Sequence, residues 1–354
     1  MDGEKVFHKS KVVAIASVVP SRRVNLCEFA NLYGQEYIER ITKSTGVKEV
    51  TVAADNKTSS DYCYEAALKL FSETGITAKD IDGLIFLTET PDYIIPNTAA
   101  VLQDRLGIPT NSINFDMRLG CAGYVYGLFQ AALLIESGYC KNVLFLAGDT
   151  MSKYVNIHDR SQRMVLGDAA CATFITRTDD DKYTSTFNFF VDGKGKRSLI
   201  IPAGGCRMPI KPGVTDVLEF DEDGNGRTKE NVYMNGMDVM VFAIRQAPKL
   251  INELLEKTGW TKDEVSLYAL HQANKIIIDR IIKTLKVDEN KVPLNIEHTG
   301  NCGFVSIPLL LCSYYSGINK NFDKVIACGF GTGLIAAACA INLSYTNFIE
   351  PFSV

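Results

Sequence analysis

Short apolar runs and one long apolar run follow one another in the first half of the chain. Residues 83–90 (GLIFLTET), 113–119 (INFDMRL) and 142–149 (NVLFLAGD) are short and apolar. Such segments are typical of strands that are buried on both faces of a sheet. Residues 122–138 (AGYVYGLFQAALLIESG) are apolar along nearly their whole length, which predicts a helix that is buried on most sides. The pattern therefore predicts an α/β fold.

The second half repeats this order. Starting from Gly75 and again from Gly259, the chain runs through a short charged turn, a strand, a helix, a second strand, a Ser-Gly-terminated helix and a third strand. In the second series we expect these strands in LYALHQAN, VPLNIEH and DKVIACG. The spacings between the landmark glycines agree to within one residue (Gly120, Gly138 and Gly148; Gly300, Gly317 and Gly329). This agreement predicts a duplicated chain.

The duplication predicts two pseudo-symmetric α/β halves in layers, with one buried helix from each half packed between two sheets. We place the first half at residues 1–180 and the second at 181–354, because the polar stretch TRTDDDKY separates them. The segment from about Phe187 to Asn231 is rich in Gly, Asp and Lys, which predicts a surface excursion.

The repeat places Cys121 and Asn301 at equivalent junctions between a strand, a glycine and a helix (LGCAG and TGNCG), and His271 at the end of another strand. A helix N-terminus offers free N–H groups and a positive dipole end. A cysteine there is expected to have a lowered pKa and to act as a nucleophile. Histidine and asparagine side chains can both donate hydrogen bonds to one thioester oxygen and so stabilise an enolate.

The glycine-rich stretch Gly329-Phe330-Gly331-Thr332-Gly333 is expected to be a loop that approaches a ligand closely. Backbone N–H groups from Gly331, Thr332 and Gly333, together with that of Cys121, would form an oxyanion hole for acyl transfer.

Composition narrows the class of protein. Hydrophobic residues make up 46% of the 354 residues, and the net charge is −4, so nothing favours nucleic acid or an anionic membrane as a partner. No apolar run is long enough for a spanning helix, and the first residues do not form a signal peptide. The ten cysteines contain no C-x-x-C pair, so each is expected to be a buried free thiol in a cytoplasmic protein without a metal.

On these motifs the chain resembles the β-ketoacyl-acyl-carrier-protein synthase III family over nearly its whole length. The matching segments are KSTGVKE, LGCAG, LGDAA, HQAN, GNCGFVSIP and GFGTGL. The resemblance implies a thiolase-like, five-layered αβαβα fold, a homodimer and catalysis by Cys121, His271 and Asn301 without a cofactor. A primer acyl group would move from coenzyme A or a carrier protein to Cys121. Condensation with malonyl-acyl-carrier protein and loss of carbon dioxide would then give a 3-oxoacyl product.

The resemblance also implies roles outside the catalytic set. Asn274 would hold the pantetheine arm of the substrate, Arg160 would pack on the adenine of coenzyme A, and Ile95 would close the acyl pocket of the partner subunit. Basic residues on two predicted helices would form the face that receives an acidic carrier protein, although a solvated surface explains them equally well (Lys275, Arg280, Lys283 and Lys286; Arg245 and Lys249).

The chain departs from the family pattern at several positions. The only tryptophan is Trp260, so the family's adenine-stacking tryptophan is missing from EYIERITKSTG. Met237 and Val241 stand where the family has an asparagine and a lysine. Thr332 and Ala336 occupy the places of a glycine and a tryptophan, and the latter loss would enlarge the acyl site. The residues before the nucleophile are Met117-Arg118-Leu119-Gly120, where the family has small ones. These departures suggest a specialised paralogue with its own primer or carrier.

Two other functions stay open from the sequence. The first is an acyltransferase that passes the acyl group to a hydroxyl or an amine without decarboxylation, against which Asn301 argues. The second is a non-catalytic partner subunit of a heterodimeric synthase, against which the retention of all three candidate residues argues.

Overall fold

The computed structural model describes residues 6–318 and 322–354, and two sheets organise it. The first sheet has six strands in the order β17-β2-β8-β7-β5-β6. Their bounds are Asn347–Ser353 (β17), Ser10–Val19 (β2), Ala169–Arg177 (β8), Asn142–Asp149 (β7), Gly83–Leu87 (β5) and Ile113–Met117 (β6). The second sheet has five strands in the order β1-β9-β16-β15-β14. Their bounds are Val6–Phe7 (β1), Ser185–Val191 (β9), Ile335–Ile341 (β16), Val325–Gly331 (β15) and Leu267–Leu270 (β14).

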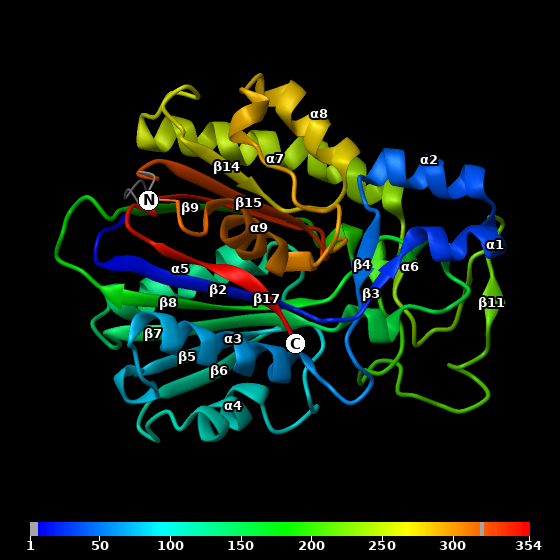
Figure 1. The fold of residues 1–354 in the computed structure, drawn as a ribbon, viewed down its shortest axis with the longest axis horizontal. Helices are drawn as coiled ribbons and strands as arrows, with labels where there is room; N and C mark the ends of the chain where they lie inside the picture. Colours follow the sequence, from blue (N-terminus) through cyan, green and yellow to red (C-terminus); the bar gives the residue numbers. More distant parts are fainter. Residues whose placement is uncertain (1–5, 319–321) are drawn as a thin grey trace.

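Helices fill three layers around these sheets (Figure 1). Helices α5 (Gly123–Glu136) and α9 (Ser306–Tyr315) lie between the sheets and share one core with strands of both. Helices α3 (Ser59–Thr74) and α4 (Thr98–Leu106) cover the outer face of the first sheet. Helices α7 (Gly236–Thr258) and α8 (Lys275–Leu285) cover the outer face of the second. The five-layered αβαβα arrangement expected from the sequence is thereby confirmed.

The two sheets repeat one pairing pattern. Strands β5 and β7 are parallel, and β7 pairs with β8 antiparallel. Strands β14 and β15 are likewise parallel, and β15 pairs with β16 antiparallel. Helix α5 follows β6 and Gly120, and α9 follows Gly300 at the equivalent place in the second half. The strands at the two ends of the chain each join the sheet of the opposite half: β1 belongs to the second sheet and β17 to the first. The division at residue 180 stays a prediction.

One expected strand is absent. Residues 292–298 (VPLNIEH) form no strand in the structure, so β6 has no counterpart and β14 lies at the edge of its sheet. Pro293 has no N–H to give to a ladder. The Glu297 carbonyl instead accepts from the N–H groups of Lys48 (2.8 Å) and Glu49 (3.0 Å), and Ile296 is fully buried. The segment therefore packs on a neighbouring subdomain rather than in the sheet.

That subdomain lies at one end of the molecule, where its helices are drawn in blue (Figure 1). It contains β3 (Arg23–Asn25), β4 (Glu49–Thr51), α1 (Ala30–Tyr33) and α2 (Gln35–Thr45), with α6 (Arg160–Arg163) beside them. A small core of its own unites these elements (Leu26, Phe29, Ile38, Val47, Val50, Met164 and Ile296).

The surface excursion begins later than expected. Phe187 is buried and belongs to β9, which pairs with β16 along its length. The excursion therefore starts after Val191. It contains only two-residue strands, which are β10 (Leu199–Ile200), β11 (Glu219–Phe220), β12 (Gly226–Arg227) and β13 (Tyr233–Met234).

The cysteines largely match their expected environment, and all ten are free thiols. Most are buried, but Cys27 and Cys206 are exposed, so the expectation of uniform burial is wrong for these two. Within residues 6–318 and 322–354, no helix is long and apolar enough to cross a membrane.

Candidate active site

Cys121 lies between β6 and α5, at the start of the first central helix. The Gly123 N–H donates to the Gly120 carbonyl (2.7 Å), and this turn places Cys121 two residues before the first residue of α5. Cys121 is partly buried and lines a cavity of about 360 Å³. The cavity therefore gives a ligand access to the thiol.

The end of β15 packs directly on Cys121. A Cβ added to Gly331 would lie 2.7 Å from the Cys121 Sγ, and one added to Gly329 would lie 2.5 Å from the Cys121 carbonyl oxygen. Only glycine fits at these two positions, because any side chain would collide with the cysteine. Gly329 and Gly331 belong to β15, so the loop expected at 329–333 is confined to the turn after the strand, where Thr332 and Gly333 lie.

The acidity of Cys121 is opposite to the expectation. Burial, with a smaller contribution from the nearby Glu89, raises the pKa of the Cys121 thiol to about 12. Hydrogen bonds from the backbone N–H groups of Thr332 and Cys121 itself lower this pKa, but burial outweighs them. The resting site thus holds a thiol. The same two N–H groups lie beside the sulfur, close to the position where the carbonyl oxygen of a bound thioester would become an oxyanion during acyl transfer.

Asn301 lines the same cavity and lies where the second half approaches the first. Its backbone N–H donates to the Val165 carbonyl (2.7 Å), and its own carbonyl accepts from the Gly167 N–H (3.1 Å). Its side-chain Oδ1 accepts from the Gly303 N–H (3.0 Å). Because the oxygen is held in this way, the Nδ2 group is left as the donor that the cavity side can use.

His271 follows β14 directly and is 1% exposed. Its Nδ1 lies 2.8 Å from the Ser306 Oγ, at the first residue of α9. Burial lowers the pKa of His271 to about 4, so the ring is neutral at physiological pH. A neutral imidazole carries a single N–H, and its partner at the other nitrogen decides which one.

The three candidate residues converge through β15. The His271 N–H donates to the Cys328 carbonyl (2.8 Å), and its ring meets the Phe330 ring edge-on at 5.3 Å. Phe330 separates Gly329 from Gly331, which pack on Cys121. Asn301 and Cys121 both line the cavity, and His271 is buried next to the strand that packs on Cys121.

The cavity also contains residues that the sequence did not single out. Glu89, Arg118 and Asp149 line it beside Cys121. The remaining wall is largely apolar (Met151, Leu166, Leu199, Ile200, Ile201, Val232 and Met234). A carboxylate directly after a buried strand, as in LTET, was the available signal for Glu89. Thr332 lines the cavity, but Ala336 packs in the core under α7 and α8, so the loss of a tryptophan there does not enlarge the acyl site.

The residues expected to bind the arm and adenine of a substrate have other partners in the structure. Asn274 caps α8, because its Oδ1 accepts from the Ile277 N–H (2.8 Å). Arg160 donates to the Asp223 carbonyl (2.6 Å) and stacks over the Tyr37 ring at 4.7 Å. Arg40 lies over the same ring at 5.2 Å. One ring is therefore already in contact with two guanidinium groups.

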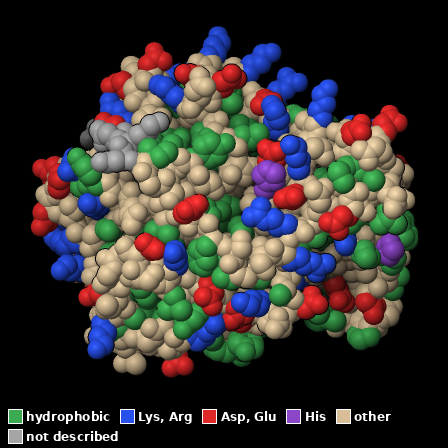
Figure 2. All heavy atoms as spheres, in the orientation of Figure 1, with side chains coloured by type: hydrophobic (Ala, Val, Ile, Leu, Met, Phe, Trp, Pro, Cys, Tyr) green, Lys and Arg blue, Asp and Glu red, His purple; other side chains and the backbone are tan. Residues whose placement is uncertain are grey.

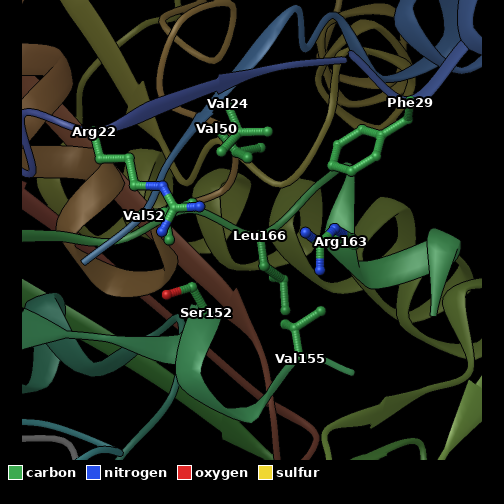
Figure 3. Close-up of a pocket in the computed structure, with 9 residues that line it drawn as sticks. All are labelled: Arg22, Val24, Phe29, Val50, Val52, Ser152, Val155, Arg163 and Leu166. Atoms are coloured by element: carbon green, nitrogen blue, oxygen red, sulfur yellow. The ribbon is translucent and has the colours of Figure 1, made fainter. Parts of the chain in front are cut away.

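A smaller cavity of about 70 Å³ adjoins the first at Leu166 (Figure 3). In this view Arg22 and Arg163 stand on either side of Leu166. The Arg163 guanidinium lies over Phe29 at 5.0 Å, and its buried Nε has no hydrogen-bond partner among the residues that the structure describes.

Ile95 lies on the exposed segment between β5 and α4. Tyr93, Ile94 and Ile95 are 58%, 89% and 83% exposed. Three large apolar side chains exposed in a row are unusual on a monomer surface.

Comparison with known proteins points to one family. The family model for 3-oxoacyl-[acyl-carrier-protein (ACP)] synthase III matches residues 115–195, and the model for its C-terminal part matches residues 255–343. The β-ketoacyl-[acyl-carrier-protein] synthase III of Clostridium perfringens (strain SM101 / Type A) is 34% identical over 342 residues, which cover 95% of this chain and 100% of that protein. The protein of the same name from Clostridioides difficile (strain 630) is 33% identical and covers 94% and 98%.

Solved structures agree with these relatives. The 3-oxoacyl-(acyl-carrier protein) synthase from Burkholderia xenovorans LB400 superimposes with a TM-score of 0.91 at 31% identity, and covers 99% of this chain and 98% of its own. The priming β-ketosynthase from the R1128 polyketide biosynthetic pathway superimposes with a TM-score of 0.80 at 26% identity, and covers 96% and 97%.

Proposed function

The chain belongs to the 3-oxoacyl-[acyl-carrier-protein] synthase III family, and from this premise we propose that it is a condensing enzyme with Cys121 as its acyl-carrying nucleophile. A primer acyl thioester acylates Cys121, and decarboxylative condensation with malonyl-acyl-carrier protein then gives a 3-oxoacyl product. Acyl thioesters are its substrates, and no resident cofactor takes part. We place it in the cytoplasm, where its thiols stay reduced.

The loading step transfers the acyl group from one sulfur to another. The Cys121 Sγ forms a bond to the thioester carbonyl carbon, and the bond from that carbon to the donor sulfur breaks. The proton of the Cys121 thiol ends on the departing thiol. The N–H groups of Cys121 and Thr332, which already hydrogen-bond the sulfur, would stabilise the negative oxygen of the tetrahedral intermediate.

The condensation step passes through an enolate, and two hydrogen-bond donors are needed to stabilise the enolate oxygen. Loss of carbon dioxide from the malonyl group leaves its electron pair on the thioester enolate. The Asn301 Nδ2 and a protonated His271 Nε2 would hydrogen-bond the enolate oxygen. The enolate carbon then attacks the acyl carbon on Cys121, a C–C bond forms, and the cysteine leaves as a thiolate that regains a proton.

The observation that best supports this function is the fixed orientation of Asn301. Its Oδ1 is held by the Gly303 N–H, so that its amide N–H groups are available in the cavity of Cys121. A simple acyltransferase has no need of such a donor, because no enolate forms. A non-catalytic subunit has no need of the cavity or of the nucleophile.

Two measurements test the proposal. Wild type and Cys121→Ala are incubated with matched acyl-coenzyme A and acyl-carrier thioesters, and the intact mass is recorded. An acyl adduct is expected on the wild type alone. If no thioester acylates Cys121, the chain is a partner subunit and not an enzyme.

The second measurement is carbon dioxide release from malonyl-acyl-carrier protein. Asn301→Ala is expected to lower this release about 10²-fold or more, as does the removal of one oxyanion donor elsewhere, while the adduct on Cys121 still forms. An adduct without any release of carbon dioxide by the wild type would favour the non-decarboxylating acyltransferase.

The contact between Arg160 and Tyr37 bears on whether coenzyme A or a carrier protein donates the primer. Arg160 is proposed to pack on the adenine of coenzyme A, and Asn274 to hold the pantetheine arm. Because Tyr37 already covers one face of the Arg160 guanidinium, adenine can pack only on the other face. We therefore expect the carrier-bound primer to acylate Cys121 faster than the coenzyme A thioester of the same acyl group.

Carrier docking is proposed on α7 and α8. Figure 2 shows basic side chains along the top of the molecule, over these helices. Arg245 and Lys249 are exposed on α7, and Arg280, Lys283 and Lys286 are exposed on α8. Lys275 is partly engaged, because it pairs with Asp279 (2.5 Å). Met237 and Val241 are 63% and 51% exposed in line with Arg245, so the docking face would combine apolar and basic contacts.

A further inference from the structure

Three charged side chains meet at one edge of the first sheet. Strand β5 is parallel to both β6 and β7, so the carboxyl ends of the three strands lie together. Glu89 follows β5, Arg118 follows β6, and Asp149 ends β7. All three line the cavity that contains Cys121.

Asp149 has a structural task in this group. Its Oδ1 accepts from the N–H groups of Glu89 (2.7 Å) and Thr90 (3.1 Å) and from the hydroxyls of Thr88 (2.9 Å) and Thr90 (3.1 Å). These bonds fix the backbone of the segment after β5. The segment consequently presents the Glu89 side chain from a rigid position.

Glu89 and Arg118 influence each other electrostatically but form no close ion pair. Within residues 6–318 and 322–354, neither the Glu89 carboxyl nor the Arg118 guanidinium has a hydrogen bond or an ion pair. A Cβ on Gly120 would lie 3.1 Å from the Glu89 Oε2, so this carboxyl is beside the residue that precedes the nucleophile. Burial raises the pKa of Glu89 to about 7, and Arg118 limits the rise.

Glu89 is partly buried without a hydrogen bond to its carboxyl from the described residues, whereas Arg118 is exposed, so a ligand that hydrogen-bonds the Glu89 carboxyl recovers part of the cost of burying it. The rest of the cavity is lined mainly by aliphatic side chains. The shape therefore suits an acyl chain that is apolar along most of its length and polar close to the thioester.

We infer that the primer is a hydroxyacyl thioester, with a hydroxyl within a few carbons of the thioester carbonyl that lies between Glu89 and Arg118. A hydroxyl donates one hydrogen bond to a carboxylate and accepts one from a guanidinium. A carboxylate on the primer would face the ionised form of Glu89, and an ammonium would face Arg118, so each meets a like charge. A plain alkyl group leaves both side chains unpaired.

This inference rests on the proposed function, because it names the substrate of the same cysteine. The loading step is unchanged, with the same bonds made and broken at sulfur. The hydroxyl takes no part in the chemistry and contributes only to binding.

The test compares four carrier-bound primers of equal length, which are butyryl, 3-hydroxybutyryl, succinyl and 3-aminobutyryl. The rate of adduct formation on Cys121 is measured by intact mass. We expect the hydroxyacyl primer to react about 10- to 100-fold faster than butyryl, in line with hydrogen bonds to charged groups. Equal rates for butyryl and 3-hydroxybutyryl, or a preference for either charged primer, would overturn the inference.

Variants then locate the preference. Glu89→Gln and Arg118→Met are each expected to reduce the ratio of hydroxybutyryl to butyryl rates at least fivefold. Glu73→Gln, which removes an exposed carboxylate on α3, serves as the matched control and should keep the ratio. A ratio that survives both substitutions would contradict the role of these side chains. If no primer acylates Cys121 of the wild type, the proposed function itself is wrong. Equal acylation by all primers would refute only the preference for a hydroxyacyl group.

Discussion

At the scale of single residues, the environment of Cys121 determines how the nucleophile is activated. Its position at a helix start predicted an acidic thiol, but the surrounding protein removes water and places Glu89 close by, and both raise its pKa. The helix start supplies only backbone N–H groups. Binding of a thioester must therefore accompany deprotonation.

The reactivity of Cys121 should follow this raised pKa. The rate of alkylation by iodoacetamide is expected to rise about tenfold for each pH unit between pH 7 and pH 10, because the thiolate fraction grows by that factor while the pH stays below a pKa of about 12. Cys27→Ala and Cys206→Ala remove the exposed thiols from the measurement. A plateau between pH 6 and pH 8 would show instead that the thiolate already exists near neutrality.

Ser306 should decide which nitrogen of His271 carries the proton. Its Oγ accepts from the Gln272 N–H (3.1 Å) and can give its proton to the His271 Nδ1 (2.8 Å) or to the Gly303 carbonyl (2.7 Å). Donation to Nδ1 leaves the histidine proton on Nε2, as the enolate requires. We expect Ser306→Ala to lower carbon dioxide release about tenfold, which corresponds to about 1.4 kcal/mol.

The tautomer itself gives an independent measurement. Nitrogen-15 spectra of the wild type should show the His271 proton on Nε2, and Ser306→Ala should show a mixture. Unchanged spectra in this variant would assign Ser306 a purely structural role.

At the scale of elements, the sequence predicted those segments whose partners lie within the same half. The buried pattern of residues 122–138 correctly indicated α5, and the short apolar runs indicated β5, β6 and β7. The strand predicted at residues 292–298 is wrong, because this segment pairs with Lys48 and Glu49, which lie far away in the chain. The functional residues divide in the same way. Cys121 and Asn301 were found from the repeat, whereas the place of Glu89 after a buried strand was a weak signal until the structure showed it beside Cys121.

The contact between α5 and β7 makes a prediction about Gly127. A Cβ at this helical position would overlap the Phe145 ring. Alanine ordinarily stabilises a helix by about 1 kcal/mol relative to glycine, but overpacking costs about 1–3 kcal/mol. Gly127→Ala should therefore lower the free energy of unfolding in denaturant titration. Gly236→Ala at the start of α7 is the matched control, because no atom lies within 4 Å of its added Cβ. Equal stability of the two variants would contradict the close packing.

At the scale of the whole molecule, the repeat predicted central helices between two sheets, and the family resemblance predicted all five layers. The oligomeric state depends instead on surfaces that are exposed in the single chain. Strand β6 lies at the edge of its sheet, and its unpaired backbone groups are suited to pairing with another strand. The exposed apolar residues Tyr93, Ile94 and Ile95 follow the neighbouring strand β5. Together they support the proposed homodimer, in which β6 meets the partner's β6.

If the dimer forms in this way, Ile95 should close the acyl cavity of the other subunit and limit primer length. Light scattering should first give twice the mass of one 39.0 kDa chain. Ile95→Trp is then expected to lower loading of an octanoyl primer at least tenfold and to affect acetyl much less, because the larger ring shortens the cavity. A mixed dimer of Ile95→Trp with Cys121→Ala decides between the two subunits. Its one reactive cysteine lies on the Ile95→Trp chain but would receive the partner's Ile95, so octanoyl loading should recover. Loading that stays low in the mixed dimer would mean that Ile95 acts on its own chain.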